Sequence, residues 1–313
     1  MASVRPVQGR LCSAGTFQGV TWTITAFYRF TPLPKDGLSD IRASIASYMA
    51  ERQMLGLVVI GEEGINGTVA GTGLAIHAFK QYVQGLLGIE DLRFKDSESD
   101  VAPFLTISVD IRDEIVTMKK PGLVPAPSEN RHLCAKEWHE MLSSDTPKIV
   151  IDTRNDYETI AGKFRGAIDP QIENFAEWSS YLDKAEIPRD VPVLIYCTGG
   201  IRCEKAILEM KDRGFEDVYQ LRDGILGYLE EFPNGLFEGE CFVFDRRVTV
   251  GPDLKPTGNF GVCAGCGTTT PQKQTCEFCG KLVFFCPQCS ARPVIACSKA
   301  CRDRVLHRRR RAA

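Results

Sequence analysis

Residues 191–205 read VPVLIYCTGGIRCEK, and this stretch decides the fold of the chain. Val191–Tyr196 is a short apolar run typical of a buried strand, and Glu204–Arg213 has the pattern of a helix. A strand that passes through a glycine-rich turn into a helix is typical of an open α/β sheet, in which ligands bind at the carboxyl ends of the strands. We therefore expect the chemistry of the chain to lie in the turn between them.

Strand and helix alternate on both sides of this turn. We expect further strands at Ile149–Asp152 and Val218–Leu221, and helices at Trp138–Leu142 and Trp178–Leu182. Such alternation predicts a parallel sheet with helices on both faces. We place this α/β domain at residues 131–250.

The turn itself is the predicted active-site loop. Its residues are Cys197, Thr198, Gly199, Gly200, Ile201, Arg202 and Cys203. The two glycines let successive backbone N–H groups point at the Cys197 sulfur, and the helix that follows adds its positive N-terminal end. Such surroundings lower a cysteine pKa to about 3.5–7.5, so we expect a thiolate at neutral pH. Arg202 is expected to hold a bound anion from the side.

The role of Cys203 stays open between two interpretations. It could resolve an oxidised or persulfidated Cys197, or it could pack at the start of the helix. A buried, inert cysteine is the alternative for Cys197 itself, but the adjacent glycines and Arg202 favour catalysis.

The N-terminal part of the chain has a different order of elements. We expect strands at residues 21–30, 55–60, 65–70, 93–95 and 105–109, and helices at 38–52 and 74–87. The resulting βαββαβ order predicts an α+β domain of the ferredoxin-like or acylphosphatase-like type over residues 20–118. Trp22, Phe27, Tyr28 and Phe30 are expected in its core rather than on a base-stacking surface. Residues 1–19 are expected to form a flexible leader, and residues 119–130, with three prolines, a linker.

Eight of the thirteen cysteines fall in the C-terminal segment, residues 251–313, in four close pairs. They are Cys263 and Cys266, Cys276 and Cys279, Cys286 and Cys289, and Cys297 and Cys301. Clustered pairs of this spacing predict two structural zinc sites with four thiolates each. Iron–sulfur clusters are the competing interpretation. Sequential and interleaved pairings both stay open. The histidines at positions 132 and 139, beside Cys134, are a weak metal candidate.

Charge is distributed unevenly along the chain. From Cys263 onward there are ten basic and two acidic residues, a net of +8, whereas the remaining residues carry a net of -10. The run Arg308, Arg309, Arg310 and Arg311 is the predicted contact to nucleic-acid phosphates. No apolar run reaches the roughly 18 residues of a membrane helix, and the leader lacks the apolar core of a secretory signal. We expect a cytoplasmic protein without a membrane partner.

The loop and its surroundings resemble the rhodanese family of sulfurtransferases. The matching segments are Asp152-Thr-Arg154, Gly162–Ile168, Cys197–Cys203 and Gln220–Ile225. The resemblance implies that Cys197 carries a persulfide and that Asp152 and Arg154 support the site. Lys163 stands where that family usually has His, and Asp223 where it usually has Gly. A loop of six residues from Cys197 to Arg202 resembles the sulfur-handling members more than the phosphatases, whose loop is one residue longer.

A closer resemblance is to the tRNA uridine hydroxylase family, in which a rhodanese domain follows an acylphosphatase-like domain. The similar segments are Glu63–Thr68, Glu114–Met118, Ile151–Glu158, Cys197–Lys205 and Gly239–Asp245. The resemblance implies that the chain converts the wobble uridine of tRNA to 5-hydroxyuridine with dioxygen as co-substrate, and that Cys197 is essential. We see no flavin, haem or NAD motif, and Gly71-Thr-Gly73 is too short for one.

Two other functions compete with hydroxylation. One is a thiosulfate sulfurtransferase or persulfide sulfur carrier that uses Cys197. The other is a non-catalytic nucleic-acid or protein adaptor that is built around the cysteine-rich segment. The residues do not identify protein partners or an electron donor.

Overall fold

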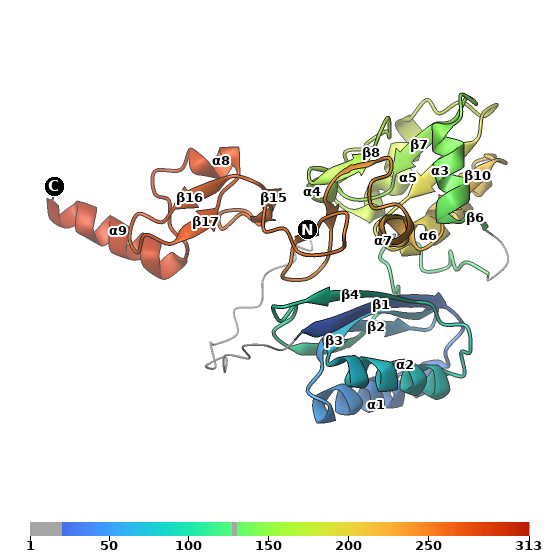
Figure 1. Ribbon diagram of the computed structural model, residues 1–313, viewed down its shortest axis with the longest axis horizontal. Helices are drawn as coiled ribbons and strands as arrows, with labels where there is room; N and C mark the ends of the chain where they lie inside the picture. The colour runs from blue at the N-terminus through green and yellow to red at the C-terminus, as the bar shows by residue number, and fades with distance from the viewer. Residues whose placement is uncertain (1–20, 127–129, 313) are drawn as a thin grey trace.

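The computed structural model describes residues 21–126 and 130–312. The expected leader, with Cys12, lies outside the described residues. Figure 1 shows three parts in chain order: an N-terminal sheet with two helices below it, a second α/β part above that sheet, and a C-terminal cysteine-rich segment that extends to one side.

The N-terminal part is a five-stranded sheet that is covered on one face by two helices. Its elements are β1 (Trp22–Phe30), the 3-10 helix η1 (Lys35–Gly37), α1 (Leu38–Glu51), β2 (Leu55–Gly61), β3 (Gly64–Gly71), α2 (Gly73–Leu87), β4 (Phe94–Ser99) and β5 (Ile107–Ile111). The strand order is β4-β1-β3-β2-β5. The first four strands confirm the predicted ferredoxin-like order. The strand that was expected at residues 105–109 is β5, which begins and ends two residues later and pairs in parallel with β2. β4 begins one residue later than expected and runs four residues further.

Local sequence explains where these elements begin and end. The Thr72 hydroxyl accepts a hydrogen bond from the Ala75 N–H at 3.2 Å and caps the start of α2, which ends at Gly88 in the left-handed conformation. Gly64 opens β3 with a φ of 141°, and a Cβ there would lie 2.0 Å from the Arg29 carbonyl oxygen. Only glycine fits so close to a neighbouring strand.

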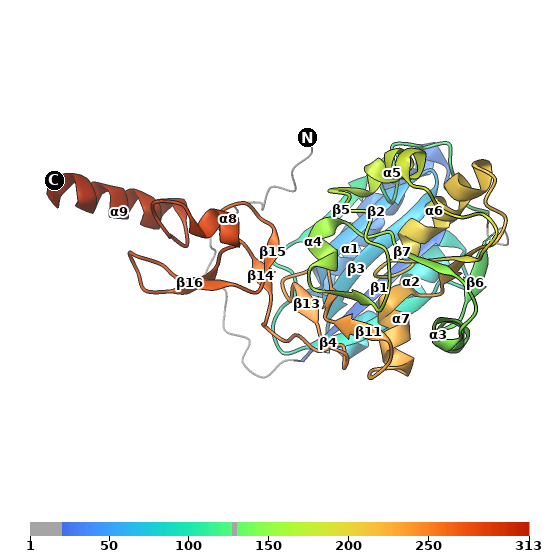
Figure 2. The same ribbon diagram turned by 90° about the horizontal axis from the view of Figure 1, so that it is seen from above.

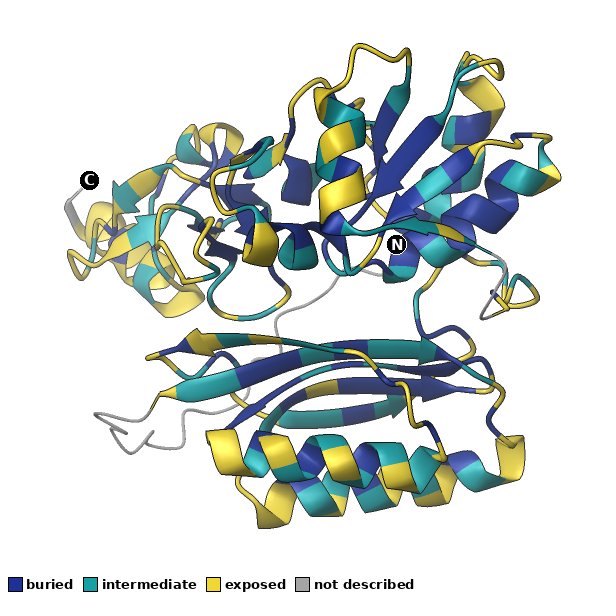
Figure 3. Cartoon of the chain, turned by 45° about the vertical axis from the view of Figure 1, so that its right-hand side comes forward, coloured by how far each residue is buried: buried dark blue, intermediate teal, exposed yellow. Residues whose placement is uncertain are grey.

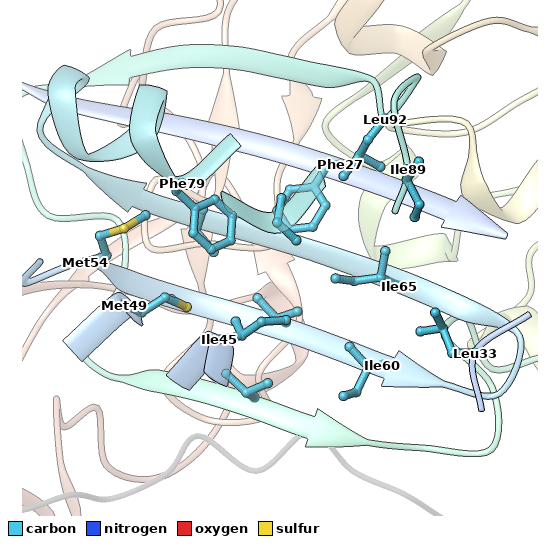
Figure 4. Packing of buried hydrophobic residues seen from close by; sticks show 14 of the residues in the cluster. Phe27, Leu33, Ile45, Met49, Met54, Ile60, Ile65, Phe79, Ile89 and Leu92 are labelled. Atoms are coloured by element: carbon cyan, nitrogen blue, oxygen red, sulfur yellow. The ribbon is translucent and has the colours of Figure 1, made fainter. Parts of the chain in front are cut away.

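The core of this part lies between the sheet and its helices (Figure 4). Phe27 and Ile65 point from the sheet toward Ile45 and Phe79 of the helices, and all four are nearly inaccessible. Phe27 therefore packs in the core as expected. The opposite face of the sheet is turned toward the second part of the chain (Figure 1).

The second part contains a four-stranded parallel sheet in the order β6-β10-β9-β7. Its elements are β6 (Arg131–Leu133), α3 (Ala135–Ser143), β7 (Ile149–Asp152), α4 (Asp156–Thr159), β8 (Gly162–Phe164), the 3-10 helix η2 (Phe175–Glu177), α5 (Trp178–Lys184), β9 (Val193–Tyr196), α6 (Ile201–Asp212), β10 (Val218–Leu221), α7 (Gly224–Glu231), β11 (Phe237–Gly239), β12 (Cys241–Phe242) and β13 (Thr249–Val250). The predicted parallel sheet is confirmed. Figure 3 shows its strands as largely buried, because separate apolar clusters cover the two faces.

The segment expected as a linker is tied down in its described portion. Glu114 accepts hydrogen bonds from the backbone N–H groups of Met118, Lys119 and Lys120. Leu123 packs against the apolar cluster of the parallel sheet. These contacts hold the segment against both neighbouring parts.

The cysteine-rich segment has little regular structure and two small cores. Its elements are β14 (Gly261–Val262), β15 (Thr269–Thr270), β16 (Lys273–Thr275), β17 (Leu282–Phe284), α8 (Pro287–Ser290) and α9 (Lys299–Ala312). Each core is built around cysteines, one with Phe285 and the other with Val294 and Val305. Figure 2 shows the segment projecting from the body, with α9 at its far end.

Candidate active site

The predicted loop lies where β9 ends and α6 begins. Cys197 directly follows β9, and the Gly200 N–H donates a hydrogen bond to its Sγ at 3.1 Å. Gly200 has a φ of 101°, and a Cβ there would lie 2.8 Å from the Tyr28 hydroxyl, so this position needs glycine. Gly200 therefore supplies one of the backbone donors that were expected around the sulfur.

The surroundings of Cys197 favour the thiolate. Burial raises its pKa, but a hydrogen bond with Cys203, the charge of Arg202 and the N–H groups of Arg202 and Gly200 outweigh burial and lower the pKa to about 5. An unperturbed cysteine has a pKa of about 8.5. A sulfur that is ionised at neutral pH is a strong nucleophile.

Cys203 lies in the first turn of α6 and is buried beside Cys197. Burial and the neighbouring Cys197 raise the pKa of Cys203, and the Thr153 hydroxyl lies 3.6 Å from its sulfur. Cys203 therefore stays protonated, and its thiol donates a hydrogen bond to the Cys197 sulfur. A resolving role for Cys203 stays a prediction.

Arg202 is bound by a carboxylate of its own chain. Its Nη2 donates to Glu158 Oε2 at 2.8 Å, and both side chains are buried. The Thr198 hydroxyl donates to the same Glu158 oxygen at 3.2 Å. These contacts lock the loop in place, so the expected capture of an anion by Arg202 stays a prediction.

Asp152 and Arg154, the expected supporting pair, form a buried ion pair beneath the loop. Arg154 Nη2 donates to Asp152 Oδ2 at 2.7 Å and to the Gly162 carbonyl oxygen at 2.6 Å. Neither side chain lines the cavity described next. They join the end of β7 to β8 and act as scaffold.

A cavity of about 420 Å³ lies between the Cys197 loop and the N-terminal sheet. Cys197, Thr198, Gly199, Ile201 and Arg202 line it from the loop. From the sheet come, among others, Ala26, Tyr28, Leu57, Val59, Asn66 and Lys95, and Phe104 and Phe244 contribute aromatic rings. The cysteine thus faces a space that two separately folded parts of the chain enclose.

Tyr28 and Lys95 are functional candidates that sequence reasoning missed. Tyr28 was expected in the core, yet it lines the cavity, and its hydroxyl donates to Glu204 Oε1 of α6 at 3.0 Å. Lys95 Nζ lies 3.4 Å from Asp223 Oδ1. Only the docking of the two parts brings these residues to the loop, and a local pattern does not record docking.

Asp223 explains one departure from the rhodanese pattern. Its φ of 61° is a left-handed conformation in which glycine is ordinary and aspartate is tolerated. Its carboxylate holds Arg93 at 2.5 Å as well as Lys95. An aspartate at this position, directly before α7, therefore connects the second part of the chain to Arg93 and Lys95 of the N-terminal part.

The eight C-terminal cysteines form two groups of four, with interleaved pairing. One group is Cys263, Cys266, Cys286 and Cys289, and the other is Cys276, Cys279, Cys297 and Cys301. In each group the four sulfurs lie within 4.8 Å of one another, for example 3.6 Å between Cys266 and Cys286. A tetrahedral zinc with Zn–S bonds of about 2.3 Å spaces its sulfurs about 3.8 Å apart. The groups therefore fit a single ion and leave no room for a multi-iron cluster.

The two histidines have other roles. His132 Nε2 lies 2.9 Å from Glu204 Oε1, and His139 Nδ1 lies 2.7 Å from the Tyr228 hydroxyl. Neither belongs to a metal-ligand group among residues 21–126 and 130–312.

The basic run lies on α9, where two of its arginines bind the cysteine-rich segment. Arg309 donates to Glu277 Oε2 at 2.7 Å and to the Pro293 carbonyl oxygen at 3.0 Å. Arg308 stacks on the Phe278 ring at 4.5 Å. All four arginines, Arg308 to Arg311, are nevertheless exposed.

Comparison with known proteins identifies each part of the chain. Family models described as UPF0176 acylphosphatase like domain, Rhodanese-like domain and Rhodanase C-terminal match residues 22–115, 135–231 and 238–302. In the part of the chain that the structure describes, no helix has the length and apolar character needed to cross a membrane.

Three curated relatives cover most of the chain, and each is named tRNA uridine(34) hydroxylase. The protein from Bdellovibrio bacteriovorus is 42% identical over 87% of this chain and 77% of its own length. Those from Teredinibacter turnerae and a Picosynechococcus species are 38% and 35% identical, each over 86% of this chain and over 83% and 90% of their own lengths.

Proposed function

From its membership of the tRNA uridine(34) hydroxylase family, to which the chain belongs, we propose that it hydroxylates the wobble uridine of tRNA at C5. Cys197 is the residue on which the reaction depends, and dioxygen is the oxidant. The chain is thus a tRNA-modifying oxidoreductase. A cytoplasmic location, expected from the sequence, stays a prediction.

One observation carries the assignment of the site. An ionised Cys197 faces a cavity that is enclosed by both the loop and the N-terminal sheet. Enzymes that act on a base of RNA or DNA hold the extruded base in an enclosed pocket. The thiolate would then lie beside the base rather than on an open surface.

The lining of the cavity favours a base over a small sulfur anion. Ala26, Leu57 and Val59 form apolar floor, and Phe104 and Phe244 add aromatic surface. A thiosulfate dianion would lose hydration on these apolar walls. The three arginines of the lining, at positions 112, 202 and 247, already pair with carboxylates of the chain. The sulfurtransferase alternative therefore has less support from the structure than hydroxylation.

The two cysteine groups are proposed to hold zinc. Four thiolates around one ion give a closed site, and a closed zinc site is structural. The metal would supply folding energy to a segment whose apolar cores are small. The chemistry at Cys197 does not pass through these sites.

The cysteine-rich segment is proposed to bind the tRNA backbone. Helix α9 carries exposed arginines at its far end, distant from the body. Phosphates attract Lys and Arg without reading sequence. The arginines at positions 310 and 311 are the best candidates, because Arg308 and Arg309 also fasten α9 to the segment.

The function is tested by deleting the gene and restoring it as wild type or as Cys197→Ser. Nucleoside mass spectrometry of total tRNA should show 5-hydroxyuridine derivatives with wild type and their loss with the variant. A strain without a second pathway is required. Unchanged levels after deletion in such a strain would refute the function. Purified wild-type chain could instead release thiocyanate from cyanide, while the level of 5-hydroxyuridine in tRNA does not change on deletion of the gene. That combination would favour sulfur transfer.

A further inference from the structure

The cavity has the dimensions and walls of a site for one planar base. Its volume of about 420 Å³ lies within the roughly 300–1,000 Å³ of typical small-ligand sites. The sheet contributes apolar side chains to its wall at Ala26, Leu57 and Val59, and the loop contributes Cys197. An unpaired base leaves its stack at lower cost than a paired one. A loop base of tRNA therefore suits this space.

Lys95 is the cation that the N-terminal sheet brings to the Cys197 loop. Its side chain is 9% exposed, and its Nζ lies 5.0 Å from the centre of the Tyr28 ring. A Cβ on Gly199 would lie 3.6 Å from Lys95 Cε, so the lysine passes over the loop two residues beyond Cys197. Lys95 and Cys197 thus line the same cavity.

Lys95 is held less tightly than the other buried cations of the cavity. Arg202 is bound by both oxygens of Glu158, and Arg247 by both oxygens of Asp245. Lys95 has a 3.4 Å contact with Asp223, which it shares with Arg93. Burial lowers the pKa of Lys95 against the opposing effects of Asp223 and Cys197. Its ammonium is the donor that gains most from a new acceptor in the cavity.

We propose that the Cys197 thiolate adds to C6 of the bound uracil and that the Lys95 ammonium stabilises the enolate which this addition forms. The proposal rests on the proposed function, because it takes a tRNA uridine as substrate. The S–C6 bond forms, the C5=C6 π bond breaks, and the electron pair spreads over C5 and O4. Lys95 donates a hydrogen bond to O4. No oxidant or reductant is consumed in this step.

The addition explains why the site needs an ionised sulfur. A uracil C5 is a weak nucleophile, and the enolate formed by addition at C6 is a stronger one that can attack an electrophilic oxygen. A donor aimed at the developing negative charge acts strongly in a cavity from which water is excluded. Cys197 and Lys95 would therefore activate the substrate, leaving oxygen chemistry to a later step.

The addition is tested by hydrogen exchange at C5 in the absence of dioxygen. The enolate takes a deuteron from D2O at C5, and reversal then removes either hydrogen and expels the thiolate. The full-length chain is incubated anaerobically in D2O with tRNA transcripts that carry uridine at position 34. Mass spectrometry of the anticodon fragment reads the gain of deuterium, and transcripts with cytidine at that position are the control.

Exchange at uridine 34 is expected with wild type and is expected to be lost in Cys197→Ser. Lys95→Met should slow exchange by about a hundredfold, as removal of one donor to a developing oxyanion does. Lys95→Arg, which keeps the charge, should recover part of the rate. Lys35→Met is the control with wild-type exchange, because Lys35 belongs to the same N-terminal part, forms an exposed pair with Glu62, and neither residue lines the cavity.

Two results overturn the proposal. The first is the absence of exchange with wild-type chain that binds the transcript in a filter assay and forms 5-hydroxyuridine in cells. The second is equal exchange in Lys95→Met and Lys35→Met, which removes Lys95 from the step. Failure of the proposed function is separate, since it appears as unchanged 5-hydroxyuridine in the deletion strain.

Discussion

Lys205 of α6 forms a buried ion pair with Glu63 of the N-terminal part, with 2.8 Å between Nζ and Oε2. The same Nζ lies 2.9 Å from Glu114 Oε1, and all three side chains are buried. Because α6 begins at the Cys197 loop, this contact fixes the N-terminal sheet against the loop. Glu114 of this group also lines the cavity.

Lys205→Met should destabilise the protein strongly. Removing one partner of a buried charge group leaves the other charges without compensation, at a cost of about 3–5 kcal/mol. Urea denaturation of wild type and variant measures the difference. Lys35→Met is the control, because Lys35 and Glu62 form an exposed pair whose loss costs at most about 1 kcal/mol. Equal losses for the two variants would contradict a structural role for the buried group.

Alkylation of Cys197 should depend on pH with a midpoint near its folded pKa. The pKa is lowered to about 5, so the thiolate persists above that pH and the rate falls as pH decreases through 5. The stability that comes from this shift is present above the unfolded pKa of about 8.5 and is lost as pH decreases through the folded value. Iodoacetamide labelling with peptide mass spectrometry gives the profile. Burial raises the pKa of Cys241 to about 12, so Cys241 is the internal control and should not be labelled. A Cys197 midpoint near 8.5 would refute the thiolate assignment.

Cys203→Ala should raise the Cys197 midpoint. The variant loses the thiol hydrogen bond to the Cys197 sulfur, and hydrogen bonds to charged groups contribute about 1.5–3 kcal/mol, or about one to two pH units. The same labelling experiment reads the shift. An unchanged midpoint of Cys197 alkylation would show that the hydrogen bond does not stabilise the thiolate. If the variant still hydroxylates tRNA, Cys203 is not a resolving cysteine that the reaction needs.

Purified protein should contain two zinc ions per chain, one for each cysteine group. Cys286→Ser should lower the content to about one, because it removes a ligand from one group only. Chelation should unfold the cysteine-rich segment and weaken tRNA binding while the parallel sheet stays folded, since the segment has separate cores. Plasma emission spectrometry and circular dichroism measure the two effects. A metal content near zero in reduced, freshly purified protein, or iron in place of zinc, would contradict the assignment.

Sequence predicted the loop and its sheet because their signals are local. The strand at Val193–Tyr196, the two glycines and the start of α6 are adjacent in the chain, and their geometry follows from that order. The cysteine pairs were equally visible, but their interleaving was not, because it depends on how β16 and β17 fold back between the pairs.

The rest of the site could not be predicted from local pattern. Tyr28 and Lys95 lie on adjacent strands of the N-terminal sheet and reach the loop only when two parts of the chain dock. Tyr28 resembled a core aromatic because its neighbours Phe27 and Phe30 are buried. Asp223, which stands where the rhodanese pattern has Gly, was the one sequence feature that results from this docking. Its role became clear only from its contact with Lys95 in the structure.

The central claim is that Cys197 enables transfer of an oxygen atom from dioxygen to uridine 34. Growth of the deletion strain under ¹⁸O₂, with wild-type or Cys197→Ser chain restored, tests it most directly. Mass spectrometry should find the heavy isotope in 5-hydroxyuridine derivatives with wild type and no such nucleosides with the variant. Derivatives that carry only light oxygen, or equal amounts with both chains, would contradict the account.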